Sequence, residues 1–233
     1  MNNNSNFETY LLISSKEFII SVNTDVNEKI YEEKIIIEDN IKKLNYEKLN
    51  FFLEKNIFKI EKKIKNFVKK IYIILDLDLF FPVEISVKRK NYENIIDLND
   101  LNHILYDVKN YCKKTMEGKK IIHMIIKNYR FDDNNYSIFP KGVKCNNFCL
   151  DISFFCLSNI IIQNLEKILK KYQISLSQVV NSQYVRNFLS NKQNDLFLMT
   201  KKVISGHNPN EVLFVDKIPK NKGFFEKFFN LFN

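Results

Sequence analysis

Asp76 and Asp78 are the carboxylates of this sequence best suited to acid–base chemistry. They alternate with leucines, so in a strand both side chains would point to one face, as a paired general acid and base can. The sequence places no histidine or nucleophile beside them, and a solvated strand edge is the simpler interpretation. His103 and His123 are interpreted as structural residues. We therefore predict no catalytic residues.

The glycines of the chain are too scattered to form a phosphate-binding loop. Such loops need clustered glycines, because the backbone N–H groups must approach the anion closely. The 4 glycines stand alone, at Gly118, Gly142, Gly206 and Gly223. The motifs G-x-G-x-x-G and G-x-x-x-x-G-K-[ST] are both missing. We therefore expect neither a bound cofactor nor enzymatic activity.

The cysteines could supply ligands for zinc only if they lay on suitable turns. The 4 cysteines are Cys112, Cys145, Cys149 and Cys156. Zinc sites place cysteine pairs on tight turns, whereas Cys145 and Cys149 lie in an apolar stretch typical of a strand. We therefore predict reduced, partly buried thiols and no metal site.

The net charge of +9 raises the question of an anionic partner. Arginine is the residue that binds phosphate and guanine with two hydrogen bonds, and the basic residues include only Arg89, Arg130 and Arg186 of this type. The lysines are spread along the chain and form no stripe in the sequence. We therefore predict that the chain does not bind nucleic acid.

The last residues of the chain combine aromatic and basic side chains. At about 100° per residue, the apolar side chains of residues 222–233 gather on one side of a helix. The predicted membrane-binding residues are Phe224, Phe225, Phe228, Phe229, Leu231 and Phe232, with Lys220, Lys222 and Lys227 near anionic headgroups. The alternative is a terminal helix that packs on the protein's own core. No apolar run approaches the roughly 18 residues of a membrane span.

Hydrophobic spacing predicts a mixed α+β fold. Strand patterns occur at 10–14, 17–22, 29–38, 71–75, 83–88, 120–131 and 146–155, with further strand-like segments near 175–181, 196–204 and 211–218. Helical spacing predicts a long helix from Tyr46 to Phe67, a second helix capped by Asp97 and a third that begins near Ser158. Residues 83 to 155 are therefore expected to form a strand, a helix and two further strands.

An ordered series of motifs lies between residues 121 and 189. Its first part comprises Ile121-Ile122-His123, Tyr129, Asp132, Asp133, Ile138, Pro140, Gly142, Leu150 and Ile152. Its second part comprises Asn164-Leu165, Ile174, Val179, Val180, Ser182 and Tyr184. The first part resembles the inserted strand-helix-strand-strand subdomain of the bacterial cell-division protein FtsA. The second part is similar to the segment where that family's chain returns to its actin-like core.

The sequence departs from that family at both phosphate loops. The strand end at residues 12–16 reads Leu-Ile-Ser-Ser-Lys and holds neither the aspartate nor the glycine of the family's first loop. The second glycine-rich loop should follow residue 190 and is missing. ATP binding and direct binding of the FtsZ tail are therefore not carried over from the resemblance.

The resemblance implies an α+β fold with a partial, FtsA-type actin-like subdomain. The expected divisions are 1–92 for the first part of the actin-like subdomain, 93–157 for the inserted subdomain, 158–205 for the return to the actin-like subdomain, 206–221 for a hairpin or linker, and 222–233 for the amphipathic helix. The family contacts other FtsA copies and division proteins through the inserted subdomain. We therefore expect residues 93–157 to bind division proteins or a second copy of the chain.

The leading hypothesis is a non-catalytic, membrane-associated adaptor in bacterial cell division. It would lie on the cytoplasmic face of the inner membrane and bind anionic lipids through its C-terminal helix. One alternative is a protein like PilM, which assembles type IV pili and resembles FtsA in fold. The other is a divergent actin-like ATPase or sugar kinase.

Overall fold

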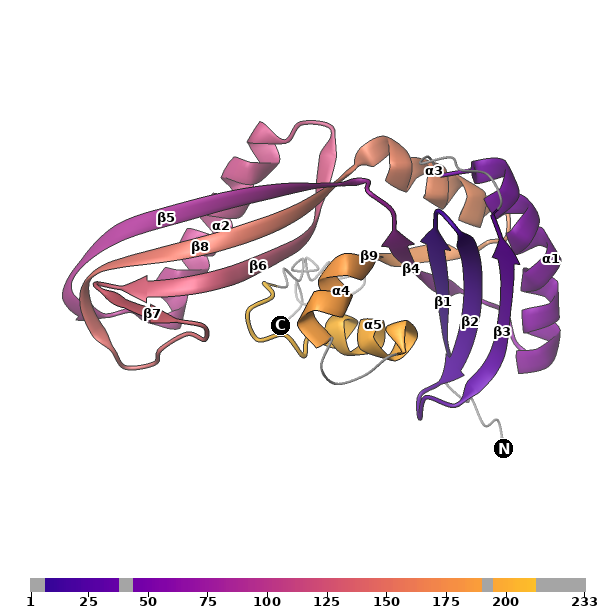
Figure 1. Ribbon diagram of the computed structural model, residues 1–233, viewed down its shortest axis with the longest axis horizontal. Coiled ribbons are helices and arrows are strands. Elements are labelled where there is room, and N and C mark those ends of the chain that lie inside the picture. Colours follow the sequence, from indigo (N-terminus) through magenta and orange to yellow (C-terminus); the bar gives the residue numbers. More distant parts are fainter. Residues whose placement is uncertain (1–6, 38–43, 190–194, 213–233) are drawn as a thin grey trace, which may run out of the picture.

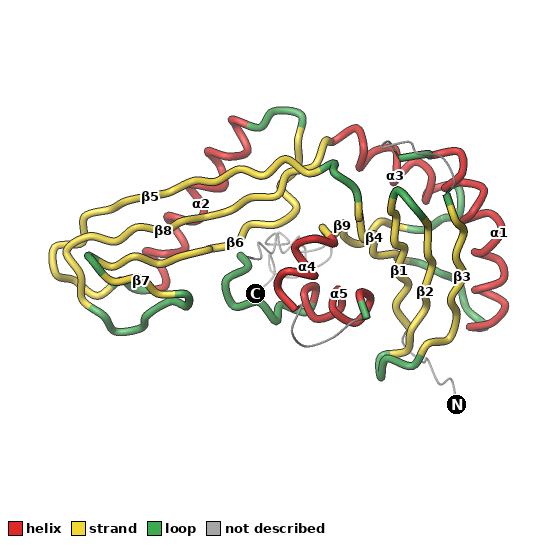
Figure 2. The backbone as a smooth tube through the Cα atoms, in the orientation of Figure 1, coloured by secondary structure: helices red, strands yellow, loops and turns green. Residues whose placement is uncertain are grey.

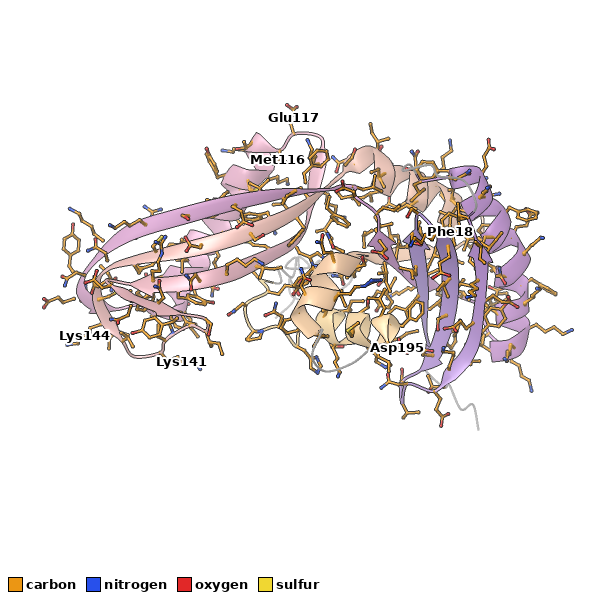
Figure 3. The ribbon with its side chains drawn as sticks, in the orientation of Figure 1. Phe18, Met116, Glu117, Lys141, Lys144 and Asp195 are labelled. Carbon is orange, nitrogen blue, oxygen red and sulfur yellow. The ribbon has the colours of Figure 1, made fainter. Side chains whose placement is uncertain are left out.

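The computed structural model describes residues 7–37, 44–189 and 195–212 of the 233-residue chain. These residues form two β-sheets that extend away from each other on either side of two short helices (Figure 1). We call residues 80–158 the arm, and residues 7–76 with 159–204 the body. Figure 3 shows Lys141 and Lys144 toward the far end of the arm, while Phe18 lies in the body. The predicted α+β class is confirmed.

Five strands form the sheet of the body, in the order β3-β2-β1-β4-β9. They are β1 (Phe7–Ser14), β2 (Glu17–Thr24), β3 (Lys29–Ile36), β4 (Lys70–Asp76) and β9 (Ser175–Asn181). The first three form an antiparallel meander at the strand patterns predicted for 10–14, 17–22 and 29–38. β4 is parallel to β1, and β9 is parallel to β4. The carboxyl ends of β1, β4 and β9 therefore meet at one edge of the sheet.

Helices cover both faces of this sheet (Figure 2). One face carries α1 (Tyr46–Ile64) and α3 (Asn159–Lys170), and the other carries α4 (Ser182–Leu189) and α5 (Leu196–Ile204). Leu11 and Ile13 join the core under α1 and α3. Tyr10 and Leu12 point the other way and pack toward Phe197 of α5. Burial on both faces explains the unbroken apolar run of β1.

The arm is an antiparallel sheet covered on one face by a helix. Its strands are β5 (Phe80–Ile95), β8 (Lys144–Ser158), β6 (Lys119–Phe131) and β7 (Asn134–Tyr136), in that spatial order, and its helix is α2 (Leu98–Thr115). Leu101, Leu105 and Val108 of α2 share a hydrophobic core with Ile152 and Phe154 of β8. The predicted order of strand, helix and two strands is thus present, with the short β7 added between β6 and β8.

Side-chain caps fix where two of the helices begin. Asp97 accepts a hydrogen bond from the backbone N–H of Asp100 at 2.7 Å, which confirms the predicted start of α2. Asp195 accepts one from the N–H of Phe197 at 2.8 Å and starts α5. The prediction of a strand at 196–204 is therefore wrong. A short apolar run fits a strand or a buried helix equally well, and here the aspartate cap favours the helix.

The predicted division between residues 92 and 93 falls inside β5. This strand pairs with β8 along almost its whole length, from Phe80 opposite Leu157 to Ile95 opposite Lys144. By strand pairing, therefore, the arm begins at Phe80. The predicted strand at 211–218 lies outside the described residues except for its first two positions.

Replacement of Leu53 by alanine is expected to destabilise the body strongly. Leu53 is fully buried on the inner side of α1, so its removal leaves a cavity and costs about 2–5 kcal/mol. Phe58 on the same helix is 74% exposed, and Phe58→Ala should change stability by no more than about 0.5 kcal/mol. Urea denaturation of the two variants measures the difference. Equal effects would contradict the placement of α1.

Candidate functional site

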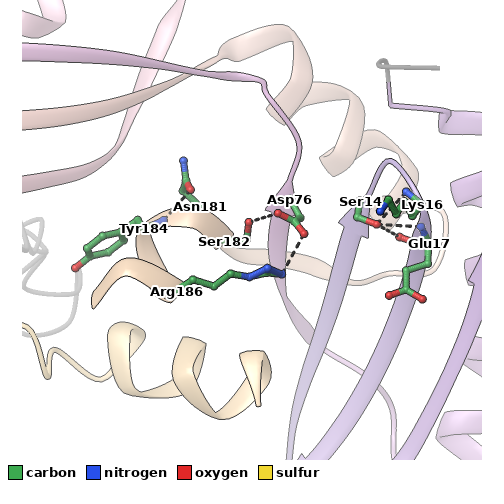
Figure 4. Close-up of polar contacts among 8 residues, drawn as sticks. All are labelled: Ser14, Lys16, Glu17, Asp76, Asn181, Ser182, Tyr184 and Arg186. Carbon is green, nitrogen blue, oxygen red and sulfur yellow. Dashed lines mark hydrogen bonds and ion pairs between the residues drawn. The ribbon is translucent and has the colours of Figure 1, made fainter. Parts of the chain in front are cut away.

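The carboxyl ends of β1, β4 and β9 form the most plausible site for a small ligand. In open sheets with parallel strands, ligands bind outside the carboxyl ends of those strands. Three groups meet here: the turn after Ser14, the carboxylate of Asp76, and the start of α4 after Asn181 (Figure 4). We call this region the carboxyl edge.

The backbone amides of the turn between β1 and β2 are bound by a side chain of the same turn. The hydroxyl of Ser14 accepts hydrogen bonds from the backbone N–H groups of Lys16 at 3.2 Å and Glu17 at 2.9 Å. It donates one to the carbonyl oxygen of Glu17 at 2.8 Å. In a phosphate loop, backbone N–H groups of this kind point at the anion. Here a serine hydroxyl already occupies them.

Asp76 is held by side chains of α4. Its carboxylate accepts a hydrogen bond from the hydroxyl of Ser182 at 2.6 Å and forms an ion pair with Arg186 at 3.1 Å. β4 ends at Asp76, so Asp78 lies in the following turn and the two carboxylates do not alternate along one strand. Asp76 is therefore a structural anchor for α4, and the interpretation of the two residues as a solvated strand edge missed this contact.

An open pocket of about 480 Å³ lies against the carboxyl edge. Its walls include Asp76, Phe80, Phe155, Ser182 and Arg186. Of the two carboxylates that line it, Asp76 is paired with Arg186, whereas Asp78 forms no such ion pair with the described residues. No glycine lines the pocket to let a ligand approach the backbone closely. The only cation of its described lining, Arg186, is therefore already engaged, and Asp78 is its one carboxylate without an ion pair.

A buried polar network lies beside this pocket, where the arm meets the body. His123 of β6 contacts the carboxylate of Glu211 through Nδ1 at 2.7 Å. Its Nε2 accepts a hydrogen bond from the backbone N–H of Asn181 at 3.1 Å. Nε2 therefore carries no proton, and Nδ1 is assigned as the donor to Glu211. We call the set His123, Asn181, Tyr184, Asn208 and Glu211 the junction network.

Tyr184 of α4 completes the junction network. Its hydroxyl donates to the second oxygen of Glu211 at 2.7 Å and accepts from the side-chain amide of Asn208 at 2.8 Å. Burial is the main cause that raises the pKa of Tyr184, and the nearby Glu211 carboxylate raises it further. The hydroxyl thus stays protonated as a donor. With both nitrogens of His123 engaged, the histidine has a structural role, as the sequence predicted.

The segment that carries Glu211 also pairs with β6. The backbone N–H of Ile126 donates to Asn210 at 2.9 Å, and the N–H of Val212 donates to Met124 at 2.8 Å. The arm is thus joined to the body by a short strand-like pairing and by a buried carboxylate. No sequence motif marks this contact, because Glu211 lies 88 residues from His123.

The other predicted sites have different outcomes. The predicted membrane-binding residues between Lys220 and Phe232 lie outside the described residues. All 4 cysteines have reduced thiols, and burial raises the pKa of Cys156 to about 12. Within the described ranges, no group of three or more His, Cys, Asp or Glu side chains is placed to hold a metal ion. Of the helices described, none is long and apolar enough to cross a bilayer.

No family model and no curated protein matches this chain significantly. Several solved structures are similar. The cytoplasmic domain of EpsL, an inner membrane component of the type II secretion system of Vibrio cholerae, is 12% identical with a TM-score of 0.37, over 77% of this chain and 57% of that one. A PilM–PilN type IV pilus biogenesis complex is 7% identical with a TM-score of 0.46, over 78% of this chain and 49% of that one.

A third similar structure is a Bacteroides thetaiotaomicron protein with an actin-like ATPase fold and unknown function. It is 12% identical with a TM-score of 0.32, over 79% of this chain and 56% of that one. The chain thus spans about half the length of these proteins. Its α+β arrangement is consistent with a partial actin-like fold, and nothing in these likenesses points to FtsA in particular. At TM-scores below 0.5 they carry no argument about function.

Removal of the Glu211 carboxylate is expected to loosen the junction. Glu211→Ala leaves the His123 Nδ1–H and the Tyr184 hydroxyl buried without an acceptor, which costs about 2–5 kcal/mol. Glu117→Ala, at an exposed turn, is the matched control and should cost no more than about 0.5 kcal/mol. Chemical denaturation measures both, and a loss below about 0.5 kcal/mol for Glu211→Ala would refute the role of the network.

Proposed function

We propose that this chain is a non-enzymatic adaptor that binds an extended segment of another protein at the cytoplasmic side of a membrane. The observation that carries the proposal is the outer edge of β5. This strand of 16 residues is an edge strand of the arm sheet, and no strand of the described part of the chain pairs with its outer side. An extended peptide can add to such an edge as a further strand.

One face and one edge of the arm sheet are already covered, and polar side chains on the other face bind one another. α2 covers its apolar face. On the opposite face, Asp151 accepts hydrogen bonds from Ser86 at 2.6 Å and Arg130 at 3.0 Å. The hydrogen bond from Ser86 is the main cause that lowers the pKa of Asp151. The edge at β6 is covered by β7 and by the segment that carries Glu211. Within the described residues, the outer edge of β5 is thus the strand edge of this sheet that is open to an added strand.

The residues of β5 suit an acidic partner segment. Lys88, Arg89 and Lys90 follow one another along the exposed part of the strand. Basic residues on an edge strand also prevent uncontrolled pairing between copies, since like charges repel. A segment with acidic side chains would neutralise this charge and gain the backbone hydrogen bonds of the edge.

The absence of enzymatic activity is part of the proposal. Two observations support it: Ser14 occupies the amides of the first turn, and Arg186 neutralises Asp76. A phosphate would have to displace both contacts before it could bind at the carboxyl edge. The chain would therefore use this edge to hold α4 in place.

The cellular system in which the adaptor works is the more specific part of the proposal. The sequence resemblance favours cell division, with the PilM-like role in type IV pili as the alternative. We propose the PilM-like role, because none of the findings favours division. The C-terminal residues from Lys220 to Phe232 would add contact with anionic lipids, as their sequence pattern predicts.

Lys88→Pro is expected to abolish partner binding through β5. Pro82 has no N–H to donate to β8, so its backbone nitrogen faces the outer side of β5. The backbone nitrogens of a strand point alternately to its two sides, and the register is unbroken from Phe80 to Lys90. The nitrogen of Lys88, six residues after Pro82, therefore also faces outward. Proline at 88 removes one outward donor and leaves the pairing with β8 intact. Lys88→Ala removes the same side chain and keeps the donor, so it is the matched control.

Pairwise two-hybrid assays of the full chain measure this effect. The partners would be the cytoplasmic segments of inner-membrane proteins from the pilus, secretion and division systems of the same cell. We expect a pilus or secretion segment to bind, Lys88→Pro to abolish the signal, and Lys88→Ala to retain it. A division segment as the partner would favour the division role instead. A signal that Lys88→Pro leaves unchanged would refute binding at β5.

The chain is not expected to bind MgATP. Calorimetric titration to on the order of 1 mM nucleotide should give no binding heat, because the amides and the carboxylate at the carboxyl edge already have partners. A dissociation constant in the micromolar range would contradict the proposal and revive the divergent ATPase.

A further inference from the structure

The segments that contain α1 and α3, with the residues that directly follow each helix, carry most of the net positive charge of the chain. Residues 46–70 and 159–171 contain eleven lysines and four glutamates, a net charge of +7 out of the +9 of the whole chain. None of the arginines lies in these two ranges. The net charge is therefore concentrated in these two segments: the helices contribute +3, and Lys65, Lys69, Lys70 and Lys171, which follow them, contribute the other +4.

The outermost line of α1 alternates phenylalanine and lysine. Phe51, Lys55, Phe58 and Lys62 follow at helical spacing, on the side away from the buried Leu53. The exposed fractions of Phe51 and Phe58 are 48% and 74%. The ammonium of Lys55 lies 4.1 Å from the centre of the Phe51 ring. Exposed phenylalanines at this spacing contribute nothing to the core of the body.

Phe67 extends this surface beyond the end of α1. It is 71% exposed and shares a groove of about 530 Å³ with Phe58, Lys69, Lys171 and Tyr172. The loop that contains Phe67 is held by a hydrogen bond at the following residue. The backbone N–H of Val68 donates to the carboxylate of Glu61 at 3.1 Å. An apolar side chain on a well-fixed loop is suited to enter a partner surface.

The two helices form one connected surface. Lys171, at the end of α3, donates to the side chain of Asn50 in α1 at 3.0 Å, and the Tyr172 hydroxyl donates to the carbonyl of Asn50 at 3.1 Å. We call α1, α3 and the loop through Phe67 the basic aromatic face. α1 lies at the end of the molecule opposite the arm, and α3 lies between α1 and the arm (Figure 1).

We propose that the basic aromatic face binds the surface of an anionic lipid bilayer. Phenylalanine has no hydrogen-bonding group and gains by entering the acyl boundary, while the surrounding lysines attract anionic headgroups without needing directed contacts. Arginine binds the phosphates of a nucleic acid with more specific geometry than lysine does, and this face contains no arginine.

This inference deepens the proposed function and rests on membrane association of the chain. It adds a second contact, separate in sequence from the C-terminal residues. With α1 and α3 on the bilayer, the arm would point away from the membrane, and the outer edge of β5 would stay open to a partner.

Co-sedimentation of the full chain with vesicles tests the inference. The vesicles would be phosphatidylcholine with or without about a third phosphatidylserine. The variant Phe58→Ser/Phe67→Ser removes the two most exposed phenylalanines of the face. The matched control Tyr106→Ser/Tyr111→Ser removes two exposed aromatic residues of α2. All four positions are exposed, so the variants should fold, which circular dichroism checks.

A second set of full-chain variants separates this face from the C-terminal residues and tests the charge. Phe228→Ser/Phe229→Ser weakens the predicted C-terminal anchor. Lys55→Glu/Lys62→Glu reverses two charges of the basic aromatic face, and a single Lys113→Glu in α2 is a charge control.

We expect the full chain to bind the anionic vesicles and to bind phosphatidylcholine alone at least about tenfold more weakly. The Phe58→Ser/Phe67→Ser variant should lower the partition coefficient about tenfold, and the tyrosine control less than about twofold. The lysine reversal should weaken binding most at low salt. The C-terminal variant should retain binding that depends on Phe58 and Phe67.

Three results would overturn the inference. If the full chain binds no vesicles, both the proposed membrane association and this face are refuted. If only the C-terminal variant loses binding, membrane association stands and the basic aromatic face is refuted. If a single-stranded oligonucleotide binds at Phe58 and Phe67 while vesicles do not, the face serves nucleic acid instead.

Discussion

A buried carboxylate between the arm and the body is the interaction on which the arrangement of the molecule depends. Glu211 accepts hydrogen bonds from His123 of the arm and Tyr184 of the body, and its side chain is only 2% exposed. A buried charge is tolerated only where it is paired and hydrogen-bonded. Because one partner lies in β6 of the arm and the other in α4 of the body, Glu211 keeps both of its hydrogen bonds only when arm and body stay together.

This constraint separates the surfaces that we assign to different roles. The arm, with β5 along its length, lies at one end of the molecule, and α1 lies at the other (Figure 1). The exposed phenylalanines Phe51 and Phe58 belong to α1. Between the two ends, at the carboxyl edge, Ser14 holds its own turn and Asp76 holds α4. These contacts of the carboxyl edge contribute to the rigidity of the body.

Local elements of this fold could be predicted from the sequence, and long-range contacts could not. The meander, α1 and the Asp97 cap depend on neighbouring residues, so hydrophobic spacing was sufficient. Segment 196–204 was predicted as a strand because a short apolar run does not distinguish a strand from a buried helix. Asp76 and Arg186 lie 110 residues apart, and no pattern along the chain links them. The concentration of charge in the segments that contain α1 and α3 also became visible only once both helices were placed on one face.

A double-mutant cycle between His123→Phe and Tyr184→Phe tests the central claim most directly. Both residues donate to Glu211, His123 from β6 of the arm and Tyr184 from α4 of the body. Once one of them is replaced, the hydrogen bond from the other is the one that remains to the buried carboxylate. The account predicts a coupling of about 1–3 kcal/mol in the free energy of unfolding. Losses that add to within about 0.5 kcal/mol would show that the two residues act independently, and would contradict a carboxylate that joins arm and body.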